Sequence, residues 1–271
     1  MRTLAKLEDK KEVLHSCNLT IKQGQKVCII GTEGSGKSML LLSILGESSL
    51  DTGTCCYNGK ISYLNMKYPL WLTSRSILEN ITMEENYNKQ KYLEILHVVG
   101  LNVDKFENSS LTLILNNADN FNSSEKRKIL IARCLYNEAD IYMFDGVFDF
   151  IDNYERKELF TRVVLKYLQN KTVIFTNTER LLARLSDRIL VMDKGVIEED
   201  GHIDEIDKKS ESLFADIINS DNFMQFQVTG FSKMLERVED SAIDKSSFEF
   251  DQKAMEDADL GSMEKSKHFH E

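Results

Sequence analysis

One glycine-rich segment, residues 31–38, constrains the fold of this chain more than any other part of its sequence. It reads Gly-Thr-Glu-Gly-Ser-Gly-Lys-Ser and lies between two apolar runs, at residues 27–30 and 39–45. A loop with this spacing, preceded by a strand and followed by a helix, is the phosphate-binding loop (P-loop) of nucleotide-binding α/β domains. The sequence therefore predicts an α/β fold with a P-loop core and a parallel β-sheet.

The residue types in this loop suit a polyphosphate ligand. Glycines let successive backbone N–H groups turn toward phosphate oxygens at the start of a helix. Lys37 supplies a positive charge for the outer phosphates, and Ser38 offers a hydroxyl group to a Mg²⁺ ion. We expect a nucleotide, ATP or GTP, to be bound by the following residues: Gly31, Thr32, Glu33, Gly34, Ser35, Gly36, Lys37, Ser38 and Met39.

A second candidate ligand is Asp145, which ends the apolar run 141–145. Burying a carboxylate at the end of such a strand is unfavourable unless it has a partner, and a Mg²⁺ ion beside Ser38 would be a suitable partner. The alternative is an exposed acid at a strand terminus. Because the P-loop occurs in the same chain, we favour Ser38 and Asp145 as ligands of the magnesium ion.

The composition excludes several classes of protein. The 271 residues carry a formal net charge of −10, whereas a nucleic-acid-binding domain is expected to have a basic face. No apolar stretch approaches the roughly 20 residues that cross a bilayer, and the sequence does not open with the apolar core of a signal peptide. The five cysteines are an odd set without metal-ligand spacing, which indicates reduced thiols in a cytosolic compartment.

The hydrophobic pattern predicts one main domain and a tail. Short apolar runs separated by turns up to residue 65 indicate an antiparallel β subdomain, and apolar residues at helical spacing after residue 76 belong to a helical insertion, placed at about 70–135. Alternating elements follow, as in a parallel sheet covered on both faces. The domain is placed at 1–228, and the acidic residues 229–271 are expected to form a disordered tail or linker. The later elements are strands at 141–145, 172–176 and 188–192 and helices at 125–136 and 154–168.

The order of these motifs resembles an ABC transporter nucleotide-binding domain. The P-loop is followed by the helical insertion, then by Asn122–Leu135 and Ile141–Asp145. Further segments at 71–81, 171–195 and 220–226 are similar to subfamily C, the multidrug-resistance-associated and cystic fibrosis conductance regulator group, and to its first nucleotide-binding domain in particular. The resemblance covers about residues 10–228. It implies the ABC-ATPase fold, bound ATP and Mg²⁺, and two kinds of partner, namely transmembrane domains and a second nucleotide-binding domain.

At the positions where this family has catalytic groups, the chain carries other residues. Gly146 stands in place of the catalytic Glu, so no carboxylate is available there to polarise water. Thr178 stands in place of the His that contacts the terminal phosphate. Met66 replaces a Gln that binds the metal ion, and a thioether is a poor ligand for a hard cation. We therefore expect hydrolysis at this P-loop to be weak or lost.

The signature segment also departs from the family pattern Leu-Ser-Gly-Gly-Gln. This chain has Phe-Asn-Ser-Ser-Glu at residues 121–125, so side chains replace both glycines where a partner domain's ATP would approach. Glu125 is expected to repel the terminal phosphate, while the Asn-x-x-Glu pattern still predicts a capped helix. The residues concerned are Asn122, Ser123, Ser124 and Glu125. The aromatic residue that stacks on adenine is also missing, because the first aromatic in the chain is Tyr57.

Two neighbouring acids have more than one interpretation. Asp152 is at the position of the family's D-loop acid, but an N-cap for the helix that follows is at least as consistent with the sequence. If the chain were a working ATPase with displaced catalytic groups, Asp149 would take the place of the missing Glu.

The sequence is thus interpreted as the ATP-binding domain of an ABC-type transmembrane transporter, held at the cytoplasmic face of a membrane. In this interpretation ATP binding is coupled to substrate transport, and the domain has no nucleic-acid partner. The alternative is a pseudo-ATPase with the same fold and a regulatory or scaffold role without transport. Upstream coding sequence for membrane helices would distinguish the two.

Overall fold

The structure is a computed structural model that describes residues 13–49, 52–66, 72–83, 86–114, 120–149, 151–177, 180–206 and 212–220. The chain divides into two units, Met1–Asn222 and Phe223–Glu271, and every described residue belongs to the first. The domain boundary predicted near residue 228 and the tail predicted at 229–271 lie outside the described residues, so both stay predictions.

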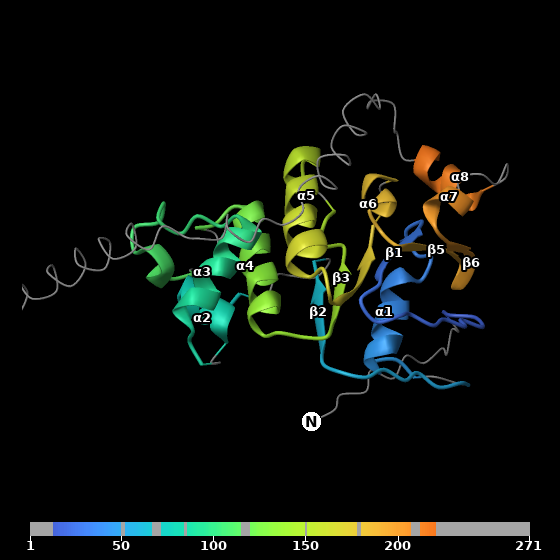
Figure 1. Ribbon diagram of the computed structural model, residues 1–271, viewed down its shortest axis with the longest axis horizontal. Helices are drawn as coiled ribbons and strands as arrows, with labels where there is room; N and C mark the ends of the chain where they lie inside the picture. Colours follow the sequence, from blue (N-terminus) through green and yellow to red (C-terminus); the bar gives the residue numbers. More distant parts are fainter. Residues whose placement is uncertain are drawn as a thin grey trace, which may run out of the picture. The chain divides into compact units, whose positions relative to one another are not determined.

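Within the described residues, six β-strands form one sheet in the order β2-β3-β4-β1-β5-β6 (Figure 1). Neighbouring strands from β2 to β5 run parallel, and β6 is antiparallel to β5. The strands are β1 Lys26–Gly31, β2 Ile61–Asn65, β3 Ile141–Asp145, β4 Thr172–Thr176, β5 Arg188–Asp193 and β6 Val196–Gly201. The predicted α/β fold with a parallel sheet is confirmed.

The central strands form because their apolar runs can be buried on both faces of the sheet. All residues of β1 and of β4 are buried, as is typical of a parallel sheet. Along β1, Cys28 and Ile30 contribute to one hydrophobic cluster, and Val27 and Ile29 contribute to the cluster on the other face. Strand β1 lies between β4 and β5, inside the sheet. The P-loop that follows β1 therefore starts at the carboxyl ends of the central parallel strands.

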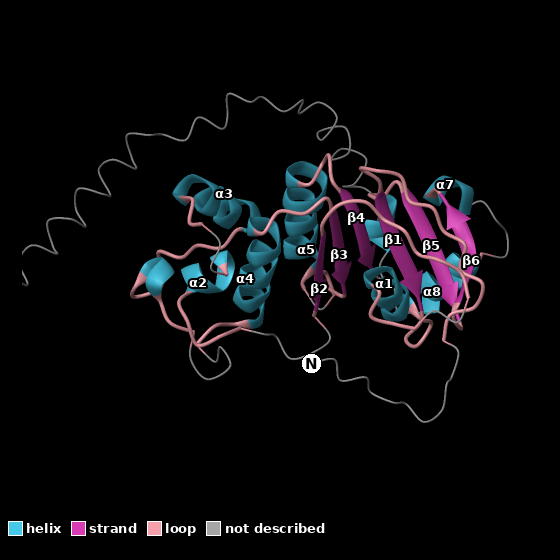
Figure 2. Cartoon of the chain, turned by 90° about the horizontal axis from the view of Figure 1, so that it is seen from below, coloured by secondary structure: helices cyan, strands magenta, loops and turns pink. Residues whose placement is uncertain are grey.

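Helices cover the sheet and extend it at one end. Figures 1 and 2 show α2, α3 and α4 grouped beyond the β2 edge, whereas α7 and α8 lie beside β6. The helices are α1 Lys37–Leu45, α2 Ile77–Thr82, α3 Lys89–Val99, α4 Ser123–Tyr136, α5 Asn153–Phe160, α6 Arg180–Arg184, α7 Ile203–Ile206 and α8 Leu213–Ser220. A short 3₁₀-helix occupies Ser109–Leu111, and a π-helix (η3, Thr161–Tyr167) follows α5. The single helix predicted at 154–168 is thus an α-helix that continues as a π-helix.

Helices α2, α3 and α4 occupy the region of the predicted helical insertion. Capping boxes begin two of them, Ser76 with Glu79 at α2 and Asn122 with Glu125 at α4. Such boxes satisfy backbone N–H groups that the first turn of a helix leaves unpaired. The capping box predicted from the Asn-x-x-Glu pattern is therefore confirmed.

The short strands expected early in the chain are not formed in the described residues 13–25 and 52–60. Their apolar runs are only two or three residues long, which is at the lower limit for a strand. Leu14, Leu19 and Ile21 instead pack from irregular backbone onto the hydrophobic cluster that includes Val27. The antiparallel pairing in the described residues is that of β5 with β6.

Strand β6 is not predicted by the sequence pattern, because its residues read Val-Ile-Glu-Glu-Asp-Gly without a long apolar run. It forms as the second half of a hairpin. Lys194 and Gly195 both have positive φ, 42° and 83°, as in the tight turns that join antiparallel strands. Across the hairpin, the guanidinium of Arg188 pairs with both carboxylate oxygens of Asp200 at 2.5 Å.

Candidate nucleotide-binding site

The P-loop follows β1 and leads into α1, and its shape depends on glycine. Gly34 and Gly36 have φ values of 80° and 104°, in the left-handed region that glycine adopts without steric cost. Gly31 lies so close to β5 that a Cβ atom on it would be 2.4 Å from the carbonyl oxygen of Met192. The loop conformation therefore depends on the positions of its glycines.

The start of α1 is suited to an anion. Gly36 caps the helix without a side-chain hydrogen bond, and the first turn contains no acidic residue. An anion at this position would meet backbone N–H groups and the positive end of the helix dipole. Lys37 is only 8% exposed, and its Nζ atom donates to the carbonyl oxygens of Gly31 at 2.6 Å and Thr32 at 2.7 Å. The ammonium group is therefore held inside the loop, where phosphates would be bound.

The P-loop is supported by segments far from it in the sequence. The N–H group of Gly195, in the β5–β6 turn, donates to the carbonyl oxygen of Ser35 at 2.9 Å. The carbonyl oxygen of Gly195 accepts from the N–H group of His15, also at 2.9 Å. A Cβ atom on Gly195 would lie 1.9 Å from the carbonyl oxygen of Val13. The hairpin turn thus fits between the P-loop and the early part of the chain, a role that no sequence motif indicates.

Asp145, at the carboxyl end of β3, is completely buried. Its Oδ1 atom accepts a hydrogen bond from the Thr176 hydroxyl group at 2.9 Å. Its Oδ2 atom accepts from Asn65 Nδ2 at 3.1 Å and from the Tyr63 hydroxyl group at 3.4 Å. The carboxylate is therefore stabilised by protein donors, as a buried charge requires. Sequence analysis did not identify these three donors, Asn65, Tyr63 and Thr176, because they belong to no motif.

The oxygen atoms of Ser38 and Asp145 fit a Mg²⁺ ion in their chemistry, since both are hard ligands. Met66, at the expected Gln position, contributes no oxygen ligand from its side chain, which packs against the large hydrophobic cluster. Its backbone N–H group donates to the carbonyl oxygen of Asp145 at 3.1 Å.

Gly146 occupies the position of the family's catalytic Glu with a φ of 67°. Its N–H group donates to the Thr176 hydroxyl group at 2.8 Å. One hydroxyl group therefore serves Asp145 as a donor and Gly146 as an acceptor, which fixes the end of β3. Thr178, at the expected His position, lies outside the described residues.

At the signature segment, Glu125 has partners within the domain. Asn122 and Ser123 are exposed, but Glu125 is buried. Its Oε2 atom accepts from the N–H group of Asn122 at 2.9 Å, and its Oε1 atom is paired with the Nζ atom of Lys105. The carboxylate is thus used within the fold, where the cap and Lys105 compensate its charge. Repulsion of a partner's phosphate by Glu125 stays a prediction.

Ser124 connects the signature segment to α5. Its hydroxyl group donates to Glu155, whose carboxylate also pairs with Lys128 of α4 at 2.7 Å. Sequence reasoning missed Lys105 and Glu155, because both are distant in sequence from the motif they support and have no local signal.

Two buried arginines hold the segment that follows Asp145. Arg127 donates to the carbonyl oxygen of Val147. Arg156 donates from Nε to Phe148 at 2.8 Å and from Nη2 to Ile151 at 2.5 Å. Burial lowers the pKa of both guanidinium groups, and the negative charge of Asp149 opposes this. The charge of Asp149 therefore compensates two buried cations, a structural role beside the catalytic one considered from the sequence.

Asp152 caps α5. Its Oδ1 atom accepts from the N–H groups of Tyr154 at 3.1 Å and Glu155 at 3.0 Å. Of the two interpretations of this acid, the structure therefore supports the helix cap.

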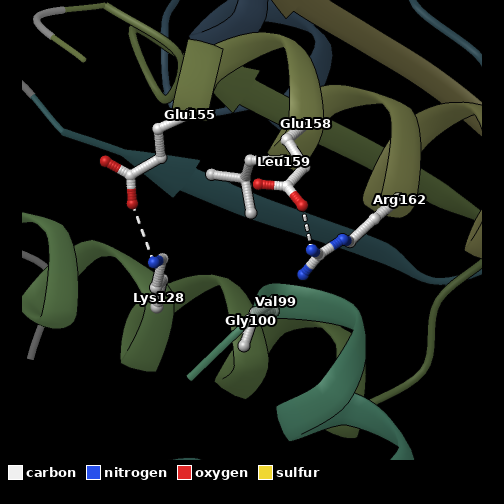
Figure 3. A pocket seen from close by; sticks show the side chains of 7 residues that line it. All are labelled: Val99, Gly100, Lys128, Glu155, Glu158, Leu159 and Arg162. Atoms are coloured by element: carbon white, nitrogen blue, oxygen red, sulfur yellow. Dashed lines mark hydrogen bonds and ion pairs between the residues drawn. The ribbon is translucent and has the colours of Figure 1, made fainter. Parts of the chain in front are cut away.

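A small cavity of about 120 Å³ lies between α3, α4 and α5, away from the P-loop (Figure 3). Figure 3 shows Lys128 pointing toward Glu155 and Arg162 toward Glu158, and each is an ion pair. The charges that line this cavity thus compensate one another, so we place the nucleotide at the P-loop, where loop shape, helix terminus and Lys37 converge.

Comparison with known proteins agrees with this geometry. The ABC transporter family matches residues 14–148. The chain is 34% identical over 205 residues to ABC transporter C family member 9 of Arabidopsis thaliana, covering 75% of this chain and 14% of that protein. It is 36% identical over 195 residues to C family member 7 of the same plant, covering 71% and 13%. With C family member 8 of Dictyostelium discoideum the identity is 30% over 223 residues, covering 79% and 14%.

The chain thus spans only 13–14% of the length of these three relatives. Among the described residues, none of the helices combines the length and the apolar character needed to cross a bilayer. Family match, relatives and the P-loop geometry agree, and the chain therefore belongs to the ABC transporter family, as a nucleotide-binding domain of its C subfamily.

Proposed function

We propose that this domain binds ATP at residues 31–39 and contributes ATP binding rather than ATP hydrolysis. The observation that carries the proposal is the contrast at the carboxyl edge of the sheet. The P-loop keeps its glycine geometry, an uncapped helix start and Lys37 inside the loop. At the end of β3, by contrast, Gly146 offers no carboxylate and its N–H group is bonded to Thr176. A nucleotide is thus held without a group that activates water.

The magnesium ligands proposed are the Ser38 hydroxyl group and the Asp145 carboxylate. When bound, a Mg²⁺ ion neutralises phosphate charge and orients the terminal phosphate. Lys37 contributes the fixed positive charge of the loop, and the start of α1 contributes backbone N–H donors. The loss of an oxygen ligand at Met66 leaves this set smaller than the family pattern.

In the full-length protein, we propose that ATP binding here is coupled to substrate transport by an ABC transporter. The partners would be transmembrane domains and a second nucleotide-binding domain, which places this domain at the cytoplasmic face of a membrane. The relatives that the chain matches are named ABC transporters and are several times longer than it, which supports further domains. The exposed Asn122 and Ser123 at the start of α4 would face the second nucleotide-binding domain.

A regulatory or scaffold role without transport is the second candidate. It is favoured by the internal use of the signature side chains, since Glu125 and Ser124 bond to Lys105 and Glu155 within this domain. Copurification of full-length protein with its membrane-spanning part would support transport. A gene product that lacks membrane helices throughout would support the regulatory role.

The proposed ATP binding is tested by incubating the domain with radiolabelled ATP and Mg²⁺ and identifying the nucleotide that stays bound. We expect intact ATP on the wild type and a loss of at least about a hundredfold in affinity for Lys37→Ala, which removes a charge-assisted contact to phosphate. Lys60→Ala is the matched control, because Lys60 is exposed and its Nζ atom donates to the carbonyl oxygen of Asn137, outside the P-loop. Steady conversion of bound ATP to ADP by the wild type would contradict the proposed loss of hydrolysis.

A further inference from the structure

Two adjacent cysteines, Cys55 and Cys56, are both exposed and carry free thiols. They lie in the segment 52–60, which precedes β2 and is exposed along its whole length. A Cβ atom added to Gly53 would meet no atom within 4 Å, so the space beside this part of the segment is open. The pair is therefore accessible to a ligand, and the nucleotide site proposed above does not use it.

The other three cysteines are less suited to react. Cys28 and Cys134 are buried, and Cys17 is partly buried. Burial raises the pKa of all three thiols, that of Cys134 to about 11. Because the thiolate is the reactive form of cysteine, a thiol reagent is expected to react with Cys55 and Cys56 first.

Direct oxidation of the pair to a disulfide is disfavoured by the covalent geometry of adjacent residues. Consecutive Cα atoms lie about 3.8 Å apart across a trans peptide bond, whereas a disulfide usually joins Cα atoms roughly 4.4–6.8 Å apart. A single atom that bonds to both sulfur atoms lets them stand farther apart than a direct S–S bond does. The pair is thus better suited to hold a bridging atom than to form a disulfide.

The backbone around the pair can turn to bring both sulfur atoms to one side. None of the residues 54–58 forms a backbone hydrogen bond to another described residue. After the pair the segment is fixed, because the N–H group of Lys60 donates to the Asp140 carboxylate at 2.9 Å and the carbonyl oxygen of Lys60 accepts from Ile141 at 3.1 Å. A turn at the pair therefore leaves the start of β2 in place.

The number of thiols decides which ligand the pair can hold. Soft sulfur ligands prefer soft centres, but a structural Zn²⁺ ion needs about four ligands. Within the part of the chain that the structure describes, no group of three or more His, Cys, Asp or Glu side chains could hold a metal ion. A trivalent organoarsenical needs only two sulfur atoms from the protein, because its third bond goes to its own carbon atom.

We propose that Cys55 and Cys56 form a dithiol site for trivalent organoarsenicals. In the reaction with an arsenoxide, two As–S bonds form and both S–H bonds break, while the arsenoxide oxygen leaves as water with the two hydrogen atoms. Arsenic stays trivalent, so the step needs neither an oxidant nor a reductant. This site shares no residue with the P-loop, and it does not depend on the proposed ATP binding.

The test treats the purified chain, without nucleotide, with phenylarsine oxide in excess 2-mercaptoethanol and weighs the intact protein by mass spectrometry. We expect one phenylarsenic group per chain in place of two hydrogen atoms. It should persist in the monothiol and be removed by the dithiol 1,2-ethanedithiol. Two thiols on one chain act at a high effective concentration, so Cys55→Ser and Cys56→Ser should each lower the affinity at least about a hundredfold.

Cys17→Ser is the matched control. It removes a partly buried thiol that has no adjacent cysteine, and it should bind the arsenical as the wild type does. Thermal unfolding should be nearly the same for the wild type and for the serine variants at 55 and 56, because substitutions at exposed positions usually have small effects on stability.

The outcomes decide whether the two thiols act together. An adduct that each single variant at 55 or 56 loses, and that Cys17→Ser keeps, would support the inference. An adduct that persists when both Cys55 and Cys56 are replaced by serine would overturn it. Removal of the group from the wild type by the monothiol, or two arsenic groups on one chain, would also overturn it, since each thiol would then react alone.

Discussion

The P-loop and the segment that follows Asp145 lie at the same edge of one sheet, but they differ in how their polar groups are hydrogen-bonded. At the P-loop, no side chain caps the start of α1, and an anion there would meet backbone N–H groups and the positive end of the helix dipole. After Asp145, backbone carbonyl oxygens are bonded to Arg127 and Arg156, and Asp152 caps α5. A helix start without a side-chain cap suits ligand binding, whereas polar groups bonded within the domain stabilise the fold.

This difference would allow a domain to keep a nucleotide site without a catalytic one, as proposed for this chain. Gly146 and Met66, at the expected Glu and Gln positions, provide no carboxylate or amide group, but both residues have partners within the domain. Thr176 bonds to both Asp145 and Gly146, and Met66 packs into the core. The end of β3 is therefore part of a hydrophobic and hydrogen-bonded region, which is expected to stabilise the domain.

The largest effect on stability is expected from Arg156→Ala. Arg156 is 5% exposed and bonds to the carbonyl oxygens of Phe148 and Ile151, so its removal leaves buried acceptors without this donor and takes away one of the two buried cations beside Asp149. We expect a loss of about 3 kcal/mol in the free energy of unfolding, measured by urea denaturation. Arg162→Ala is the control, because Arg162 forms a partly exposed ion pair with Glu158 that contributes less than about 1 kcal/mol.

If Arg156 acts only on the segment after Asp145, the ATP affinity of the folded variant stays close to that of the wild type. Arg156→Lys, which keeps the charge but not the planar group of donors, provides a folded protein if the alanine variant does not fold. A large loss of ATP affinity with unchanged stability would show that the two regions are not separate.

Gly146→Glu tests whether the missing carboxylate alone explains the proposed loss of hydrolysis. Because Gly146 has a φ of 67°, an L-amino acid at this position is strained by about 1–2 kcal/mol. We expect no ATPase turnover and a lower free energy of unfolding. Gly146→Ala has the same strain without the carboxylate and should be destabilised equally. Turnover in the Glu variant alone would show that the end of β3 adapts and that a single residue separates the two regions.

Much of this fold can be predicted from sequence because the determining signals are local. The glycines of the P-loop, the apolar runs of β1, β3 and β4 and the Asn122 capping pattern each act over a few neighbouring residues. The hydrogen bonds and ion pairs that hold the site together could not be predicted in the same way. Gly195 bonds to Ser35, Lys105 to Glu125 and Thr176 to Asp145, and only the completed sheet and helices bring these pairs together. The described residues 13–25 and 52–60 do not form the expected strands, because their apolar runs are too short to determine a strand locally.

A smaller effect is expected from Asn122→Ala, which removes the side-chain acceptor of the α4 capping box. The Asn122 Oδ1 atom accepts from the N–H group of Glu125 at 2.9 Å, and loss of an N-cap costs about 1 kcal/mol. Ser123→Ala, one residue further on and exposed, should change the free energy of unfolding by less than about 0.5 kcal/mol. An Asn122 variant as stable as the wild type would mean that this helix start, like that of α1, does not depend on a cap.

The smallest effect is expected from Glu155→Gln, which weakens the connection between α4 and α5. Burial opposes the charge of Glu155, but hydrogen bonds from Lys128 and Ser124 outweigh it, so the pKa of its carboxyl group lies below the usual value. A lowered pKa contributes stability above the unfolded pKa of about 4.3, and this contribution is lost as the pH falls through the folded value. The partners are partly exposed, so we expect about 0.5 kcal/mol at neutral pH. The difference from the wild type should vanish in acid and shrink with added salt, whereas a difference that persists in acid would show that packing of the side chain, and not its charge, joins the two helices.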